Sequence, residues 1–249
     1  MRALSFILTL FSTAALWAQP NCEAYKLYGD TLKYEACHKT KEVRGLYQFS
    51  KKYQTVMDEA LAIDSTFDYP YWAKSIAYLK SGDFITWKGL IDKAVQYNPT
   101  GHLGYRGWCR YQFFRDYEGA ISDLELLDSL VDYDPGYCQN GDYHLNIAKG
   151  LCYKAMGKKQ KAIAIIEKQI EANVKDEFVG PYDFLHLGVL YLETEQFEKA
   201  IKAFTEQSTV NELAENQYYL ALALGQQGQK VLARKHLFLA KELYADDQK

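Results

Sequence analysis

The chain has 249 residues, a formal net charge of −3 at pH 7 and a hydrophobic share of 48%. This share supports a folded core and excludes a chain that stays disordered. The small negative charge excludes the strongly basic surface that binding to nucleic acid or anionic lipid requires. Only five prolines are present, which favours helices.

The N-terminus has the pattern of a secretory signal. Arg2 supplies a positive charge, and the mostly apolar run 3–17 is too short to span a bilayer but fits a signal-peptide core. We therefore expect a signal peptide over 1–18, cleaved near Ala18, and an N-terminal segment over 19–33. The mature protein is then exported, periplasmic or secreted. No later segment is apolar enough to cross a membrane.

Five cysteines make the count odd, so at least one must stay free, pair with another chain or lie buried. Export permits disulfides, and Cys22–Cys37 and Cys138–Cys152 are the pairs closest in sequence. Burial in a helix is the alternative for each of them, and for Cys109. The residues before Cys22, Gln-Pro-Asn, do not form the small apolar motif that lipidation needs.

An internal repeat dominates the rest of the chain. Residues 181–212 predict two amphipathic helices separated by a polar break. Their apolar faces are Phe184, Leu187, Gly188 and Tyr191, then Phe197, Ala200, Ile201 and Phe204. The tyrosine that closes the first helix recurs as Tyr78, Tyr111, Tyr153 and Tyr191, with Leu224 in the last copy. The turn column is Gly82, Arg115, Gly157, Glu195 and Gly228. The small residue that opens the second helix is Ala120, Ala162, Ala200 and Ala233 in successive copies. The bulky residue one turn later is Ile91, Leu124, Ile166, Phe204 and Leu237.

These residues resemble the tetratricopeptide repeat. The resemblance implies an all-α fold, a right-handed α-solenoid of about five to six helical hairpins over 34–249. The expected copies are 34–67 (degenerate), 68–100, 101–142, 143–180, 181–213 and 214–247. The style of the repeats is similar to exported tetratricopeptide proteins of Bacteroidota. Such a motif specifies a fold and leaves the function to particular sites.

The first helices of such hairpins line the concave wall of a solenoid, which is the usual binding surface. Mixed aromatic and polar side chains there suit a peptide or an extended protein segment. The alternative for each residue is packing against the next repeat. The expected partner-binding residues are Tyr69, Trp72, His102, Tyr105, Arg106, Gln112 and His144.

Two irregular segments are further candidates. The insertion Asp134–Asp142 is dense in turn-forming residues and either meets a ligand or is a tolerated surface loop. The run Arg106–Arg115 combines three arginines with four aromatics and either grips a carboxylate or forms an internal packing cluster. The irregular middle copies, which also carry Trp87 and Trp108 at positions for small residues, are where we expect the binding function.

We find no motif for catalysis, so no catalytic residue, cofactor or metal is expected. Cys109, Cys138, His144 and Cys152 are zinc-type ligands, but their spacing matches no zinc motif. The short basic run Lys158–Lys161 is expected to form a solvated helix face and not to bind nucleic acid.

The last helix is apolar around most of its circumference, although a terminal solenoid helix is usually polar outside. We therefore expect a partner, or a second copy in a homodimer, to contact Leu237, Phe238 and Leu243. The alternative is a terminal helix that is apolar but has no partner.

The leading hypothesis is a non-enzymatic protein–protein interaction scaffold of the cell envelope. The alternatives are an envelope-assembly or chaperone-like adaptor, and a small-ligand binder or hydrolase that uses an aromatic and histidine pocket near His102 and His144. The segment 19–30 could also occupy the groove of its own chain.

Overall fold

The computed structural model describes residues 20–246, so the expected signal peptide over 1–18 lies outside the described residues. Within this range the chain forms helices and no β-strand, with one isolated bridge between Tyr137 and His144. None of the described helices is long and apolar enough to cross a membrane. The α-helices are α1 (Cys22–Leu27), α2 (Thr31–Thr40), α3 (Lys51–Ile63), α4 (Asp68–Ser81), α5 (Phe84–Tyr97), α6 (Pro99–Cys109), α7 (Tyr117–Leu130), α8 (Leu145–Ala155), α9 (Lys159–Lys175), α10 (Asp183–Glu193), α11 (Phe197–Val210), α12 (Ala214–Gln226) and α13 (Lys230–Asp246). A 3₁₀ turn (Lys41–Val43) follows α2, and a π-helical turn (Arg110–Phe114) follows α6.

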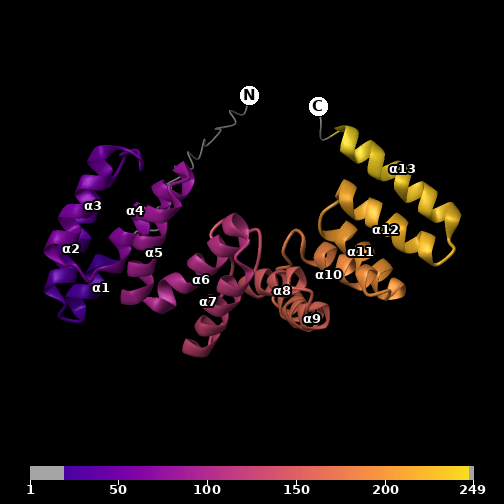
Figure 1. Ribbon diagram of the computed structural model, residues 1–249, viewed down its shortest axis with the longest axis horizontal. Coiled ribbons are helices and arrows are strands. Elements are labelled where there is room, and N and C mark those ends of the chain that lie inside the picture. The colour runs from indigo at the N-terminus through magenta and orange to yellow at the C-terminus, as the bar shows by residue number, and fades with distance from the viewer. Residues whose placement is uncertain (1–19, 247–249) are drawn as a thin grey trace, which may run out of the picture. The chain divides into compact units, whose positions relative to one another are not determined.

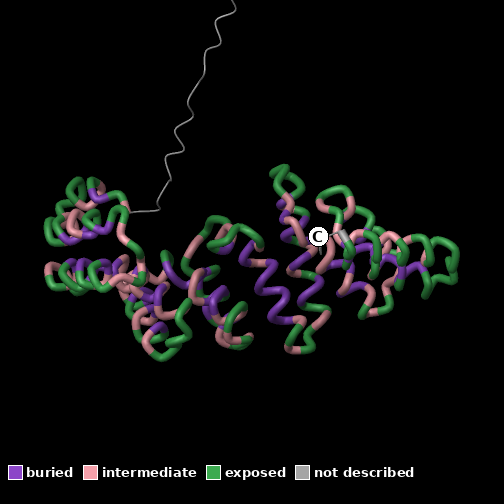
Figure 2. The backbone as a smooth tube through the Cα atoms, turned by 90° about the horizontal axis from the view of Figure 1, so that it is seen from above, coloured by how far each residue is buried: buried purple, intermediate pink, exposed green. Residues whose placement is uncertain are grey.

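Consecutive helices pack as hairpins, from α2–α3 to α12–α13 (Figure 1). Buried residues run along the helices and exposed residues gather at the turns (Figure 2). The chain divides into two compact units, one up to Tyr97 and one from Asn98 onward. The first holds α1–α5 and the second holds α6–α13. The expected fold class, an all-α solenoid of helical hairpins, is confirmed.

Short polar side chains start several of these helices. The side chains of Asp30, Ser50, Asn98 and Asp116 each accept a hydrogen bond from a backbone N–H in the first turn of the helix that follows, at 3.0–3.2 Å. Such caps satisfy amide groups that have no partner within the helix. Asn98 is followed by Pro99, whose fixed φ suits the first helical position.

The turn column of the repeat has one backbone conformation in all five copies. Gly82, Gly157 and Gly228 have φ between 74° and 83°, and Arg115 and Glu195 have φ of 51° and 59°. This left-handed conformation ends the first helix of each hairpin and reverses the chain. Glycine adopts it freely, whereas other residues lose roughly 1–2 kcal/mol. The turn geometry is therefore the same where the residue type departs from glycine.

Small residues let neighbouring helices approach closely. A Cβ atom added to Gly188 in α10 would lie 2.4 Å from Cε1 of Phe204 in α11, and one added to Gly150 in α8 would lie 2.5 Å from Cγ1 of Ile166 in α9. Phe204 and Ile166 are completely buried. The pairing of a small residue with a bulky one therefore holds the two helices of a hairpin together, as the columns predict.

A tyrosine clamp links successive hairpins in the second unit. Tyr153, at the end of α8, donates to Glu125 of α7, while Lys161 of α9 lies over the tyrosine ring at 4.0 Å and donates to its hydroxyl at 2.6 Å. The next copy repeats this pattern with Tyr191, Glu167 and Lys199. Each clamp joins a hairpin to the one before it. Its tyrosine occupies the same repeat column in both copies. We name these two groups the tyrosine clamps.

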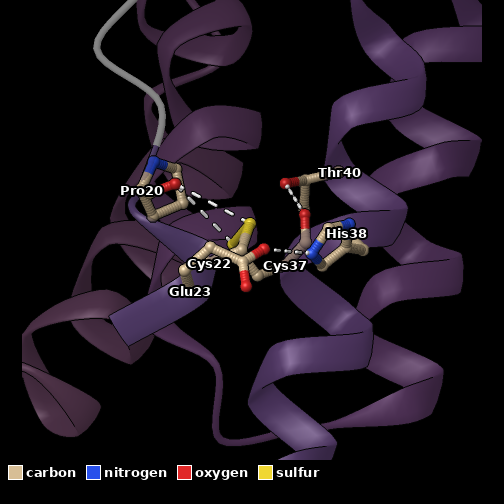
Figure 3. Close-up of a disulfide and its surroundings, with 6 residues drawn as sticks. All are labelled: Pro20, Cys22, Glu23, Cys37, His38 and Thr40. Atoms are coloured by element: carbon tan, nitrogen blue, oxygen red, sulfur yellow. Dashed lines mark hydrogen bonds and ion pairs between the residues drawn. A yellow bond between two sulfur atoms is a disulfide. The ribbon is translucent and has the colours of Figure 1, made fainter. Parts of the chain in front are cut away.

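A disulfide between Cys22 and Cys37 joins α1 to α2 in the first unit (Figure 3). Glu23 and His38, each one residue further along the chain, form a contact of 3.2 Å across the same junction (Figure 3). One of the two sequence-local pairings is therefore formed. Cys138 and Cys152 are not paired: both are buried as free thiols, as is Cys109.

Candidate functional site

The first helices of the hairpins in the second unit lie next to one another in chain order. α6 contacts α8, α8 contacts α10, and α10 contacts α12. We name the residues of these four helices that point away from the second helices the first-helix face. In a solenoid of this type this face is the wall available for binding.

His144 does not belong to the open part of this face. It is only 1% exposed and caps α8, because its Nδ1 accepts a hydrogen bond from the backbone N–H of Asn146 at 3.1 Å. Since a backbone N–H can only donate, the ring proton is on Nε2, which donates to Oδ1 of Asp134 at 2.7 Å. Both ring nitrogens are therefore used inside the fold, which does not favour the predicted contact of His144 with a partner.

Arg106 is also used internally. Its guanidinium donates to both carboxylate oxygens of Asp123 in α7, at 2.9 Å from Nε and 2.6 Å from the terminal nitrogen. Arg110 adds a contact of 3.2 Å to the same carboxylate and donates to the carbonyl of Gly119. His102, the other polar residue of α6 expected on the wall, is buried at 7% exposure. The two arginines hold α6 and the turn after it against α7, so this part of the arginine run is an internal cluster. The low exposure of Arg106 and His102 does not favour their predicted partner contacts.

The remaining predicted wall residues keep some accessible surface. Gln112 is exposed and Tyr105 is partly exposed in the second unit. Tyr69 and Trp72 are partly buried in the first unit, where they pack against the apolar cluster around Tyr53 and their rings lie 5.6 Å apart. Burial raises the pKa of the Tyr69 hydroxyl well above its usual value.

The most open apolar positions of the first-helix face lie in α12, in a regular copy. Tyr218 and Leu222 are 45% and 42% exposed. They precede the column residue Leu224 by six and two residues, the same offsets that Leu185 and Val189 have from Tyr191 in α10. Leu185 and Val189 are partly exposed. The same offsets from the repeat column therefore identify all four residues. The residues expected on the wall came from the irregular copies and did not include them.

An aromatic cluster formed by α6, α10 and the residues just before α8 and α10 was not predicted. The ring of Tyr143 lies 5.6 Å from that of Trp108 and 5.9 Å from that of Tyr182, and it stacks on His186 at 5.4 Å. Burial, with a smaller contribution from the charge of Lys154, lowers the pKa of His186 to about 4. The ring is therefore neutral at pH 7 and acts as a further aromatic surface in the cluster.

The insertion between α7 and α8 is folded, not a loose surface loop. Backbone hydrogen bonds connect Cys138 to Tyr143 at 2.8 Å and Leu145 to Gly136 at 2.9 Å. The ring of Tyr137 packs edge-on against His144 and against Phe178, which follows α9. Contacts with the start of α8 and with the segment after α9 therefore fix the position of the insertion.

A hydrogen-bonded series of amides runs beneath the insertion. Asn146 donates to Gln169, Gln169 to Asn173, and Asn173 to Asp183, at 2.8–3.0 Å. Asp183 is completely buried, and its Oδ1 has no hydrogen-bond partner among the described residues. Burial raises the pKa of Asp183 against the opposing hydrogen bonds from Gly180 and Asn173.

The cysteines and histidines do not form a metal or nucleophile site in the described part of the chain. No group of three or more His, Cys, Asp or Glu side chains in residues 20–246 is placed to hold a metal ion. Burial raises the pKa of Cys109 and of Cys152 to about 12. Both thiols therefore stay protonated at neutral pH and lack the reactivity of a thiolate.

The last helix, α13, exposes apolar side chains. Phe238 is 63% exposed, Leu237 is 38% exposed, and Leu243 is partly buried. In the preceding copies the column residue that corresponds to Leu237 is buried. α13 therefore presents a packing surface of the kind that is internal elsewhere in the repeat.

The comparisons with known proteins agree with this architecture. Residues 143–175 and 184–212 match the family model of the tetratricopeptide repeat. No curated protein sequence matches the chain. Among solved structures, PilW, described as a widely conserved type IV pilus biogenesis factor, aligns with a TM-score of 0.64 at 14% identity, over 86% of this chain and 94% of PilW.

Two further structures are similar in fold. PilF of Pseudomonas aeruginosa aligns with a TM-score of 0.62 at 17% identity, over 90% of this chain and 92% of its own. A tetratricopeptide repeat protein from Parabacteroides merdae aligns with a TM-score of 0.50 at 14% identity, over 89% and 90% of the two chains. At these identities the likeness concerns the fold alone. This chain therefore contains tetratricopeptide repeats and has the helical-hairpin fold of proteins built from them.

Proposed function

We propose that this protein is a non-enzymatic interaction scaffold of the cell envelope that binds a peptide or protein segment on its first-helix face. The observation that carries the proposal is the exposed pair Tyr218 and Leu222 on α12, next to the partly exposed Leu185 and Val189 on α10. An apolar side chain is exposed at a free-energy cost that burial against a partner recovers.

The chemistry of this face suits a segment with apolar side chains. Tyrosine gives a large contact area and keeps its hydroxyl for a polar contact at the edge. Gly225, three residues after Leu222, has open space where a Cβ would be, so a bound chain can approach the helix backbone there. Tyr105 on α6 and Gln112 in the π-helical turn after it extend the proposed surface. Tyr69 and Trp72 belong to a corresponding surface of the first unit.

The proposed location rests on one expectation from the sequence and one observation in the structure. The first is the expected signal peptide over 1–18. The second is the Cys22–Cys37 disulfide, a bond that persists in oxidising compartments outside the cytosol.

Two alternatives differ in their support. An adaptor in envelope assembly is favoured by the exposed apolar face, which suits an unfolded client segment, and PilW, of similar fold, is described as a pilus biogenesis factor. The small-ligand or hydrolase alternative is disfavoured, because His144 has both ring nitrogens engaged and His102 is buried.

A site-specific crosslinking experiment tests the scaffold. A photoreactive amino acid replaces Leu222 in the exported chain in its native host, and the control replaces Glu206, an exposed residue of the second helix α11. We expect one dominant crosslinked protein from position 222 and none from position 206. Tyr218→Glu should remove the crosslink while the helical circular dichroism and the melting temperature stay unchanged. Equal crosslinking from both positions, or an unchanged crosslink with Tyr218→Glu, would contradict the proposal.

The exposed side of α13 supports a homodimer as an additional contact. Phe238 is its most exposed aromatic residue, and Val231 lies two turns before it on the same side of the helix. Light scattering at high concentration should show a dimer that Phe238→Glu converts to a monomer. A wild-type chain that is monomeric under these conditions would end this part of the proposal.

A further inference from the structure

A cavity of about 540 Å³ lies in the second unit, between the insertion and the hairpin α8–α9. Its walls are the end of α7 with the extended segment 131–135 on one side, and α8 and α9 on the other. This volume falls within the range of roughly 300–1,000 Å³ that is usual for ligand sites. None of its lining residues belongs to the surface proposed above, so the cavity is a separate candidate site.

The wall formed by the insertion is held in place by hydrogen bonds to the exposed carboxylate of Asp134, one of which comes from the buried His144. Oδ1 of Asp134 accepts hydrogen bonds from Nε2 of His144 at 2.7 Å and from the backbone N–H of Gly136 at 2.6 Å. Partial burial raises the pKa of Asp134, but these hydrogen bonds outweigh it and hold the pKa below its usual value. Asp134 therefore stays ionised, and the segment that carries it is fixed before any ligand arrives.

The opposite wall is equally ordered. Gln169, 6% exposed, accepts from Asn146 and donates to Asn173, so its amide cannot rotate freely. Lys149, 7% exposed, forms an ion pair with Asp128. Each wall thus carries polar side chains that already have partners within the fold, and those of Lys149 in α8 and Gln169 in α9 are buried. The groups left for a ligand are those at the rim and the apolar floor.

The rim and floor have complementary chemistry. Asp132 and Asp134 flank Tyr133, which is 63% exposed. Asp132 is exposed and forms no ion pair with the described residues. The lining also has an apolar part, which includes Val131 and Ile165 and which we name the floor. An aromatic face beside carboxylates attracts a cation, and an apolar floor suits a methylene chain.

We propose that this cavity binds a basic side chain, arginine or lysine, of a peptide segment. The apolar stem of that side chain lies along the floor, and its cationic group meets Tyr133 and the carboxylate of Asp132. The lining carries three aspartates against two lysines, and Lys149 is already neutralised by Asp128, so the site as a whole favours a cation. Lys168, the second lysine, is available to the carbonyl or carboxylate oxygens of the same peptide.

The test uses two peptides that differ in one atom of the head group. Acetyl-Gly-Arg-Gly-amide is titrated into the ¹⁵N-labelled mature protein, and the same peptide with citrulline in place of arginine is the matched control. Citrulline keeps the length and planarity of arginine and removes its charge. We expect saturable shifts at the amides of 131–134 and 168–172, and binding of the citrulline peptide that is at least about tenfold weaker.

Two variants locate the site. Asp132→Asn and Tyr133→Ala change exposed groups, and each should weaken the arginine peptide at least about fivefold without loss of helical signal. Glu198→Gln, an exposed carboxylate on α11 outside the cavity, should bind as the wild type does. Equal shifts with both peptides, shifts confined to other segments, unchanged binding by Asp132→Asn, or no shift up to about 10 mM peptide would each overturn the proposal. Because the probes report on the insertion and α9, none of these outcomes bears on binding at the first-helix face.

Discussion

The guanidinium of Arg106 meets the carboxylate of Asp123 through two hydrogen bonds, at 2.9 and 2.6 Å, and both side chains are largely shielded from solvent. A pair of this kind lies between α6 and α7 and orients one helix against the other. Removal of one member leaves a buried charge without its partner, which is costly. We therefore expect Arg106 to stabilise the fold.

Arg106→Ala should lower the free energy of unfolding by about 2–3 kcal/mol, because Asp123 stays buried and, among the described residues, retains only Arg110 as a cationic partner. Arg106→Lys should cost less, since it keeps the charge but not the two-point geometry. Urea denaturation followed by circular dichroism measures both. Arg234→Ala, at an exposed position of α13, is the control and should change little. A wild-type stability for Arg106→Ala would show that the pair contributes nothing to the fold.

The tyrosine clamps predict a coupling between hairpins. Tyr153→Phe removes the hydroxyl that donates to Glu125 and should cost about 1 kcal/mol, because the carboxylate remains half exposed and water replaces part of the bond. A double-mutant cycle with Glu125→Gln measures the coupling directly. Tyr78→Phe, in the same column but without a hydroxyl partner among the described residues, should be nearly neutral. Additive effects of Tyr153→Phe and Glu125→Gln would argue against a clamp.

Two glycines in first helices should respond in opposite directions to the same substitution. Gly188→Ala places a Cβ 2.4 Å from the buried ring of Phe204 and should destabilise the protein by about 1–2 kcal/mol. Gly225→Ala meets no atom within 4 Å and should stabilise it by about 0.5 kcal/mol through higher helix propensity. Thermal and urea unfolding compare the two. Destabilisation by both, to the same extent, would mean that backbone effects outweigh packing.

Asp183 predicts a pH dependence of stability. Burial raises its pKa in the folded state, so the unfolded chain loses this proton first as the pH rises. The stability contribution is therefore complete below the usual pKa of aspartate and decreases as the pH rises through the folded-state pKa. The difference in unfolding free energy between Asp183→Asn and wild type should accordingly shift in favour of the variant from pH 4 to pH 7. Asp176→Asn, at an exposed position, should show no such trend, and a flat difference for Asp183→Asn would contradict the assignment.

The hairpins from α4 onward follow from the sequence because their columns share one set of steps along the chain, and helical periodicity depends only on local positions. The turn at Arg115 and Glu195 could be placed in the same way, since the register determines which residue must adopt positive φ. The helix α2 could not be placed from these columns. Its buried residues Ala36 and Cys37 follow no repeat column, and they are buried beside the Cys22–Cys37 disulfide.

The candidate site was less predictable than the fold. Register alone placed Arg106 and His144 on the wall, but whether a polar side chain is available depends on partners elsewhere in the chain. Asp123 lies 17 residues after Arg106, and Asp134 lies ten residues before His144. Periodicity contains no information about such pairs. By contrast, Tyr218 and Leu222 could have been found by extending the column offsets into the regular copies.

The redox state of Cys22 and Cys37 reports whether a molecule matured in an oxidising compartment. A helix of six residues such as α1 does not persist in water by itself, so its docking depends on that covalent bond and on local contacts such as that of Tyr25 with Phe67. A copy synthesised and kept in a reducing cytosol would retain two thiols and release α1. Differential alkylation of these two cysteines in extracts would therefore distinguish molecules that crossed a membrane from those that did not.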